Sequence, residues 1–420
     1  MVQRYILSNG VRFVYEELPY LRSVSIGIWI NTGSRDESPQ LSGISHFLEH
    51  MFFKGTTSHH ARQLAEMFDQ IGGQVNAYTT KEYTSLHAKV LDEHAEFALT
   101  LLAEMLFDST FDEEEMEREK KVIMEEIKMY EDNPEEAVHD WIVEKSFDGH
   151  PLGVNILGTD AHLQSFERQD LINYMESRYT PDQIVISVAG RFDVERLYAL
   201  VEGKFGHLKR SRMDLVSSSP SYHAANIFDP RHSEQTHVCL AVPGCAYTDS
   251  RMYTLALLNH LLGASSSSLL FQEVREERGL AYNVFSYHSA FRDTGLFTIY
   301  YGCSPDQASE VYTLIQSIID RLKTEGIDEK TLQKAKVQVI SSFWLSHEST
   351  SSRIGRMAKN ELYFGKQVEP EEAVAAIQAV SVQHLHAMTQ ELFAAPWSFV
   401  ALGPSEHSFD GKDPQVEKNG

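Results

Sequence analysis

The sequence contains few cysteines and no long hydrophobic run. Its 420 residues include three cysteines, Cys239, Cys245 and Cys303, an odd number without the spacing of a metal motif. We therefore expect buried, reduced thiols in place of a disulfide framework. No apolar stretch approaches the roughly 18 residues that a membrane-spanning helix needs, so we expect no membrane segment.

Positive charge is also scarce in this chain. Lysine and arginine total 37 against 60 aspartates and glutamates, which gives a net charge of −23. A nucleic-acid-binding surface needs concentrated basic side chains, so this balance argues against a nucleic-acid partner. An acidic cavity would instead attract basic peptides. The first 17 residues alternate into a strand without a signal or transit sequence, which favours a cytoplasmic, bacterial location.

The chain is long enough for two domains, and its two halves repeat one pattern. An amphipathic helix, a proline-containing turn and a buried strand ending in glycine occur at 166–190 and again at 381–403. A charged helix at 112–127 likewise has a counterpart at 328–343. We predict an α+β fold of two homologous domains, each a mainly antiparallel sheet with helices packed on one face. The predicted boundaries are 1–213, a polar linker at 214–233, and 234–420.

A short apolar helix between Gly43 and Gly55 carries the first candidate site. His46, Glu49 and His50 share one face of it, because positions i, i+3 and i+4 are neighbours. Burying such groups unpaired is costly, whereas a metal ion satisfies them together. Two imidazoles at this spacing can bind one zinc ion, and the carboxylate between them can take a proton from water. The pattern is a reversed HExxH motif and predicts a catalytic metal site.

A third ligand is expected on the acidic helix at 117–134. Helical phase places Glu119 and Glu126, seven residues apart, on its apolar side, whereas Glu125 faces solvent. One of the two could bind the metal while the other orients a histidine, and phase alone leaves open which does which. The matching segment of the second half, 255–268, keeps one histidine and no glutamate. Only the first half is therefore expected to hold the metal.

Several motifs together resemble the pitrilysin/insulysin (inverzincin) family of zinc metallopeptidases, and most closely its bacterial members that are similar to the mitochondrial processing peptidase. The resemblance implies one Zn²⁺ per chain, bound by His46, His50 and Glu126. It also implies Glu49 as general base and Glu119 as the residue that supports a ligand. The motifs are HFLEHMFFKGT (46–56), GGQVNAYTT (72–80), the Glu119/Glu126 pair, HPLGVNILG (150–158) and LFQEVREERGLAYNV (270–284).

The stretch 72–90 begins with a Gly-Gly turn and then alternates as an edge strand does. An unpaired edge beside a metal could bind an extended peptide through backbone hydrogen bonds. The resemblance implies that the substrate-binding residues of this edge are Asn76, Ala77, Tyr78 and Thr79.

Two residues of the second half, Arg275 and Tyr282, lie seven positions apart. Taken alone, Arg275 would be a surface salt-bridge residue and Tyr282 a core aromatic. The resemblance implies instead that they are catalytic, anchoring the substrate backbone and donating a hydrogen bond to the oxyanion of the transition state.

These observations predict a zinc endopeptidase that cleaves peptides or unfolded segments in a closed chamber, of which one chain forms half. Longer members of the family carry four such units, so a two-unit chain is expected to form a homodimer with composite active sites. Two alternatives remain. One is a non-catalytic peptide-binding or structural subunit of the same family. The other is an iron oxygenase that uses two histidines and one carboxylate.

Overall fold

We describe the chain from a computed structural model, which describes residues 1–209, 218–404 and 417–418. Residues 214–217 of the predicted linker lie outside the described residues. The chain forms two compact units, each made of three segments. Unit 1 comprises 1–127, 154–218 and 344–369, and unit 2 comprises 128–153, 219–343 and 370–420. The contiguous domain boundaries drawn from the sequence stay a prediction.

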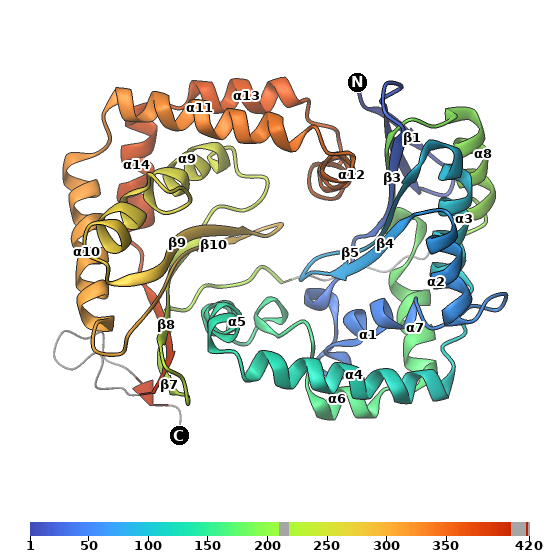
Figure 1. The fold of residues 1–420 in the computed structure, drawn as a ribbon, viewed down its shortest axis with the longest axis horizontal. Coiled ribbons are helices and arrows are strands. Elements are labelled where there is room, and N and C mark those ends of the chain that lie inside the picture. Colours follow the sequence, from blue (N-terminus) through green and yellow to red (C-terminus); the bar gives the residue numbers. More distant parts are fainter. Residues whose placement is uncertain (210–217, 405–416, 419–420) are drawn as a thin grey trace. The chain divides into compact units, whose positions relative to one another are not determined.

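Unit 1 is built on a six-stranded sheet with the order β1-β2-β6-β3-β5-β4 (Figure 1). Strands β2 and β6 are parallel, and all other neighbours are antiparallel. All seven residues of β6, IVISVAG, are buried, as expected for a central strand. The strands are β1 (Gln3–Ile6), β2 (Arg12–Glu17), β3 (Ser23–Ile30), β4 (Gln74–Thr79), β5 (Thr84–Leu91) and β6 (Ile184–Gly190).

Helices cover both faces of this sheet. Helices α3 and α8 lie on one face, and α12, from the segment 344–369, lies on the other (Figure 1). On the α12 side, Trp29 Nε1 donates a 2.8 Å hydrogen bond to Ser187 Oγ, and Trp29 shares a buried cluster with Ile354. The helices are α1 (Ile44–Met51), α2 (Ala61–Gln70), α3 (Ala95–Phe107), α4 (Glu113–Glu131), α6 (Asp160–Ser165), α7 (Arg168–Arg178), α8 (Val194–Phe205) and α12 (Thr350–Lys359).

Unit 2 contains a second six-stranded sheet with the order β12-β7-β11-β8-β10-β9. Strand β7 is parallel to β11 and β12, and the other pairs are antiparallel. The strands are β7 (Asn226–Pro230), β8 (Thr236–Gly244), β9 (Ala281–Ala290), β10 (Gly295–Cys303), β11 (Ser398–Gly403) and β12 (Glu417–Lys418). The helices are α5 (Pro134–Ser146), α9 (Met252–Leu262), α10 (Ala308–Glu325), α11 (Glu329–Ser346), α13 (Pro370–Ala379) and α14 (Val382–Leu392).

The two units repeat one topology. Five consecutive strands match, from β2-β6-β3-β5-β4 to β7-β11-β8-β10-β9, including the single parallel pair at the same place. The repeated pattern at 166–190 forms α7 and β6, and the one at 381–403 forms α14 and β11. The predicted α+β fold of two homologous domains is therefore confirmed. Each sheet also carries a helix on its second face, α12 in unit 1 and α5 in unit 2.

Two earlier expectations can be compared directly with the structure. The three cysteines are free and buried, as predicted from their spacing. Among the described residues, no helix combines the length and the apolar character needed to cross a bilayer.

A buried lysine recurs at the same place in the two repeats. Lys120 on α4 donates to the backbone oxygen of Gln164 at 3.3 Å, and Lys336 on α11 donates to that of Gln378 at 2.8 Å. Each lysine is 7% exposed. The two lysines define how the residues of α4 align with those of α11. They also show that the two helices are anchored in the same way.

We expect Lys336→Met to lower the free energy of unfolding by roughly 1–2 kcal/mol, because the Gln378 carbonyl loses a charged donor. Lys334→Met is the matched control, since Lys334 is exposed on the same helix. Urea denaturation of both variants checks this expectation. Equal stability of the two variants would contradict it.

Candidate metal centre

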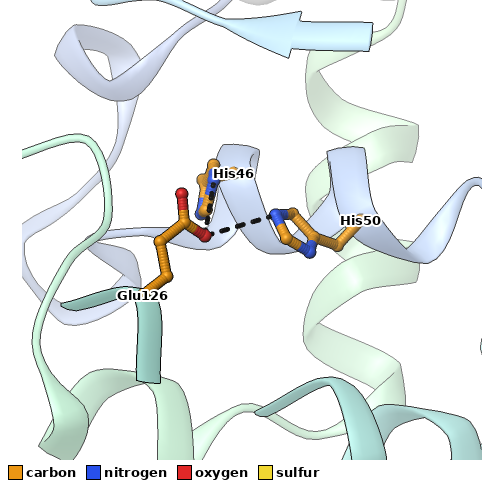
Figure 2. Close-up of side chains that lie close together, drawn as sticks. All are labelled: His46, His50 and Glu126. Carbon is orange, nitrogen blue, oxygen red and sulfur yellow. Dashed lines mark ion pairs between the residues drawn. The ribbon is translucent and has the colours of Figure 1, made fainter. Parts of the chain in front are cut away.

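Helix α1 has one apolar face and one ionisable face. Phe47, Leu48 and Met51 are at most 1% exposed and pack into the core of unit 1. The side chains of His46 and His50 point from the other face towards Glu126 of helix α4 (Figure 2). Helix α1 starts after Gly43, as the sequence predicts, and it ends at Met51, before Gly55.

Glu126 lies between the two imidazoles. Its Oε2 atom is 3.8 Å from His46 Nε2 and 3.7 Å from His50 Nε2 (Figure 2). Ligand atoms around one zinc ion, each about 2.0–2.1 Å from it at tetrahedral angles, lie roughly 3.3 Å apart. The three side chains therefore fit a zinc ion after a small contraction. In the described part of the chain they are the one set of three such side chains whose ligand atoms all lie within 4.8 Å of one another.

Glu119 contacts the other nitrogen of His50. Its Oε1 atom is 2.8 Å from His50 Nδ1, and its Oε2 atom is 2.5 Å from Lys54 Nζ. Burial alone would raise the pKa of Glu119, but hydrogen bonds from His50 and Lys54 together hold it below the usual value. The ionised carboxylate favours a proton on Nδ1, which leaves the Nε2 lone pair facing Glu126.

The structure thus separates the two glutamates that helical phase left together. Glu126 faces both histidines, and Glu119 supports one of them from behind. The sequence did not single out Lys54, because it lies beyond the end of α1 and its contact with Glu119 depends on the turn that follows the helix.

Two buried polar atoms beside this site have no hydrogen-bond partner among the described residues, Glu49 Oε2 and His46 Nδ1. Burial raises the pKa of Glu49, and the neighbouring Thr79 and the electrostatic effect of His50 oppose that shift. Burial lowers the pKa of His46 to about 3, with a smaller contribution from His50. A neutral His46 keeps a lone pair for a metal, and Glu49 keeps a free oxygen for a proton.

Strand β4, with residues 76–79, forms the edge of the sheet next to α1. Thr79 Oγ1 donates to the backbone oxygen of Ser45 at 3.4 Å, which links the strand to the helix. Asn76 is exposed, and its Oδ1 accepts the Ala77 amide hydrogen at 2.9 Å. Tyr78 is half-buried against Trp29. The edge therefore lies beside the candidate metal centre with its outer side unpaired by any described strand.

Arg275 and Tyr282 lie in unit 2 and contact each other. The Arg275 guanidinium is 4.7 Å from the centroids of both the Tyr282 and the Phe271 rings. Tyr282 is 71% exposed, so the alternative that it is a core aromatic is wrong. Both residues line a cavity of about 440 Å³ together with the 263–266 loop and the start of β9. The stacking of Arg275 on two rings holds Tyr282 at the edge of unit 2's sheet.

The second repeat lacks the ligands. Helix α9 can be aligned with α1 through its single histidine, and α11 with α4 through the buried lysines. At the positions that match the metal centre, the second repeat then has one imidazole and no carboxylate. The remaining histidine, His260, pairs instead with Gln338, whose Oε1 lies 2.7 Å from its Nε2. The positions matching His46, Glu49, His50, Glu119 and Glu126 are Ala256, Asn259, His260, Ala335 and Ser342. Only the first repeat offers a metal site of this kind among the described residues.

Comparison with known families gives two matches along the chain. Residues 12–160 match the model described as insulinase (peptidase family M16), and residues 165–339 match the model described as peptidase M16 inactive domain. The first match contains the whole candidate metal centre. The second begins in the first repeat, just before α7, and ends within α11 of the repeat that lacks the ligands.

Individual relatives resemble the chain over almost its full length. An uncharacterized zinc protease of Bacillus subtilis, YmxG, is 46% identical over 96% of this chain and 99% of its own. An uncharacterized zinc protease of Streptomyces coelicolor is 36% identical over 96% of this chain and 90% of its own. The crystal structure of a protease from Helicobacter pylori has the same fold, with a TM-score of 0.90 at 22% identity over 96% of this chain and 99% of that one.

We expect His50→Ala and Glu126→Ala to lose bound zinc, because each removes one of three side chains that converge on one point. Glu49→Gln should keep about one zinc per chain, since Glu49 lies beside the three and not among them. Elemental analysis of purified, dialysed protein measures the metal content. The control is Glu125→Ala, an exposed neighbour on α4. Loss of metal in this control with retention in Glu126→Ala would contradict the assignment.

Proposed function

The chain belongs to peptidase family M16, and on that premise we propose that it is a zinc-dependent endopeptidase that cleaves peptides or unfolded segments. The observation that carries the proposal is the convergence of His46, His50 and Glu126 beside Glu49, which has a buried oxygen with no partner among the described residues. One zinc ion per chain and a cytoplasmic, bacterial location are parts of the same proposal.

A bound metal ion would activate a water molecule and the substrate carbonyl. His46, His50 and Glu126 would hold a zinc ion, which would lower the pKa of a water molecule and polarise a carbonyl oxygen. Glu119 fixes the ring of His50, and Lys54 keeps Glu119 charged and in place. These contacts hold the ligands in position before substrate arrives, so little reorganisation is needed during the reaction.

Glu49 moves the proton. Its free Oε2 atom accepts a proton from the attacking water and later delivers it to the leaving amine. Burial raises the pKa of Glu49, which makes its carboxylate a stronger base than an exposed glutamate and improves its ability to hold the proton between the two steps. Thr79 of the edge strand β4 lies beside Glu49 and opposes the effect of burial on its pKa.

The substrate is proposed to bind as an added strand on β4. An extended peptide there would pair with the backbone of residues 76–79, and its scissile carbonyl would lie beside Glu49. To expose the Ala77 amide, the Asn76 side chain must turn away from the hydrogen bond that it now makes. Backbone pairing explains why such a site would accept many sequences, since it reads the peptide's conformation and not its side chains.

Arg275 and Tyr282 are proposed to complete the active site by binding substrate backbone and donating a hydrogen bond to the developing oxyanion. The exposure of Tyr282 and its contact with the Arg275 guanidinium support this role. We further propose that two chains pair about a twofold axis to enclose a chamber, so that this pair serves the metal centre of the partner chain.

The main competing function is a non-catalytic, peptide-binding subunit of the same family. The intact set of ligands with Glu49 beside it favours an enzyme, because such a subunit has no need of a general base. The iron oxygenase alternative shares the ligand types, but the family match and the zinc protease relatives favour hydrolysis.

We expect purified protein to cleave peptides in a mixture, and Glu49→Gln to lose nearly all of this activity while retaining zinc. Mass spectrometry of the digest with and without a chelator identifies the cleaved bonds. Internal cleavage sites that disappear with chelator support the proposal. A zinc-loaded wild-type protein that cleaves nothing would favour the non-catalytic subunit.

Composite sites predict complementation between two inactive variants. Homodimers of Glu49→Gln and of Tyr282→Phe should each be nearly inactive, but mixed dimers hold one site with both residues intact. Activity should rise to about a quarter of wild type after random exchange, an expectation from dimer symmetry. Native mass spectrometry confirms the exchange. Exchanged dimers without activity would mean that Tyr282 does not serve a partner's metal centre.

A further inference from the structure

The helix that carries the two histidines has no cap of its own. Helix α1 contains only eight residues, and its N-cap position is Gly43, which has no side chain to accept the first amide hydrogens. Unpaired amide groups at a buried helix start are costly, because the first four have no partner within the helix. The usual cap residues, serine, threonine, aspartate and asparagine, are therefore missing where a short functional helix most needs one.

Backbone packing explains why Gly43 cannot be replaced by such a residue. Its φ of 93° lies in the left-handed region, and a Cβ atom there would approach the backbone oxygen of Leu157 to 2.6 Å. A Cβ atom on Gly158 would likewise approach the oxygen of Ser42 to 2.4 Å. The 150–158 loop thus touches the start of α1 backbone to backbone. A cap for this helix has to come from elsewhere in the chain.

Glu37 supplies it from seven residues upstream of the helix. Its Oε2 accepts the Gly43 amide hydrogen at 2.7 Å, and its Oε1 accepts the Ser45 amide hydrogen at 2.8 Å. The side chain is buried, with the residue 7% exposed. A buried carboxylate that binds two amides at a helix start also interacts favourably with the helix dipole. Both oxygens thus bind the backbone of the three-residue stretch 43–45.

The contacts of Ser45 connect this cap to the active site. Ser45 precedes His46 directly, its hydroxyl is 2.9 Å from the Tyr174 hydroxyl, and its carbonyl accepts from Thr79 of the edge strand. We propose that Glu37 is a positioning residue, which holds the start of α1 so that His46 and His50 meet Glu126 at metal-binding distance. This inference rests on the proposed metal centre and adds to it a residue that touches neither metal nor substrate.

Zinc affinity tests the proposal without any measurement of activity. Glu37→Gln keeps the shape of the side chain but presents an NH₂ group to one of the two amides, so one hydrogen bond is lost. We expect zinc affinity, measured by competition with a coloured chelator, to fall at least about tenfold. The visible spectrum of the cobalt-substituted protein should change as well, because it reports ligand geometry. Asp36→Asn is the control, with the same charge change one residue away.

The outcomes separate positioning from general stability and from failure of the metal centre. Wild-type zinc affinity and an unchanged cobalt spectrum in Glu37→Gln would overturn the proposal, even if its melting temperature fell. If Glu37→Gln does not fold, Glu37→Asp decides, with an expected loss of at least about threefold since the shorter carboxylate cannot reach both amides. Wild-type affinity in that variant would also overturn it. Absence of zinc binding in wild-type protein would contradict the metal centre itself.

Discussion

The structure of the candidate site depends on one conflict, namely that a short helix must bury one face while carrying three ionisable groups on the other. The apolar face of α1 is fixed in the core by Phe47, Leu48 and Met51. The polar face of the helix is consequently shielded from water. Ionisable groups that are shielded from water need hydrogen-bond, ion-pair or metal partners. Lys54 pairs with Glu119, and Glu119 pairs with Nδ1 of His50. Glu126 lies 3.7 Å from the other nitrogen of His50, where a metal ion would complete the contacts. Two atoms of this polar face, Glu49 Oε2 and His46 Nδ1, have no hydrogen-bond partner among the described residues, and a free carboxylate oxygen is the state expected of a base.

The duplication shows which parts of this arrangement belong to the fold and which belong to the chemistry. The strand order and the buried lysine on the long helix occur in both repeats, so they serve stability. Four of the five ionisable positions of the metal centre change in the second repeat, and the remaining His260 makes an ordinary hydrogen bond to Gln338. Because the same backbone forms with either set of side chains, the metal is not needed to specify the fold of the repeat.

The sequence was sufficient for much of this picture. The period of hydrophobic residues marked α4 and α11, and the i, i+3, i+4 spacing placed His46, Glu49 and His50 on one face. Helical phase could select Glu119 and Glu126 but could not order them, because both lie on the same stripe of α4. Lys54 and Glu37 were missed, since their roles depend on how distant backbone segments pack. The same limit applies to α12, because nothing in its own residues shows that it packs on the sheet of the first repeat.

The position of α12 limits where the chain can be divided into separate fragments. Trp29 and Val185 on the sheet of unit 1 are buried against Ile354 and Met357, which lie more than 150 residues later in the chain. A fragment that stops at residue 213 would expose this apolar face to water, and the remaining fragment would carry the apolar face of α12 without its sheet. The two repeats are therefore not autonomous modules. Although they arose from one pattern, each has become dependent on a segment encoded in the other half, so recombination between them would produce insoluble halves and not smaller working proteins.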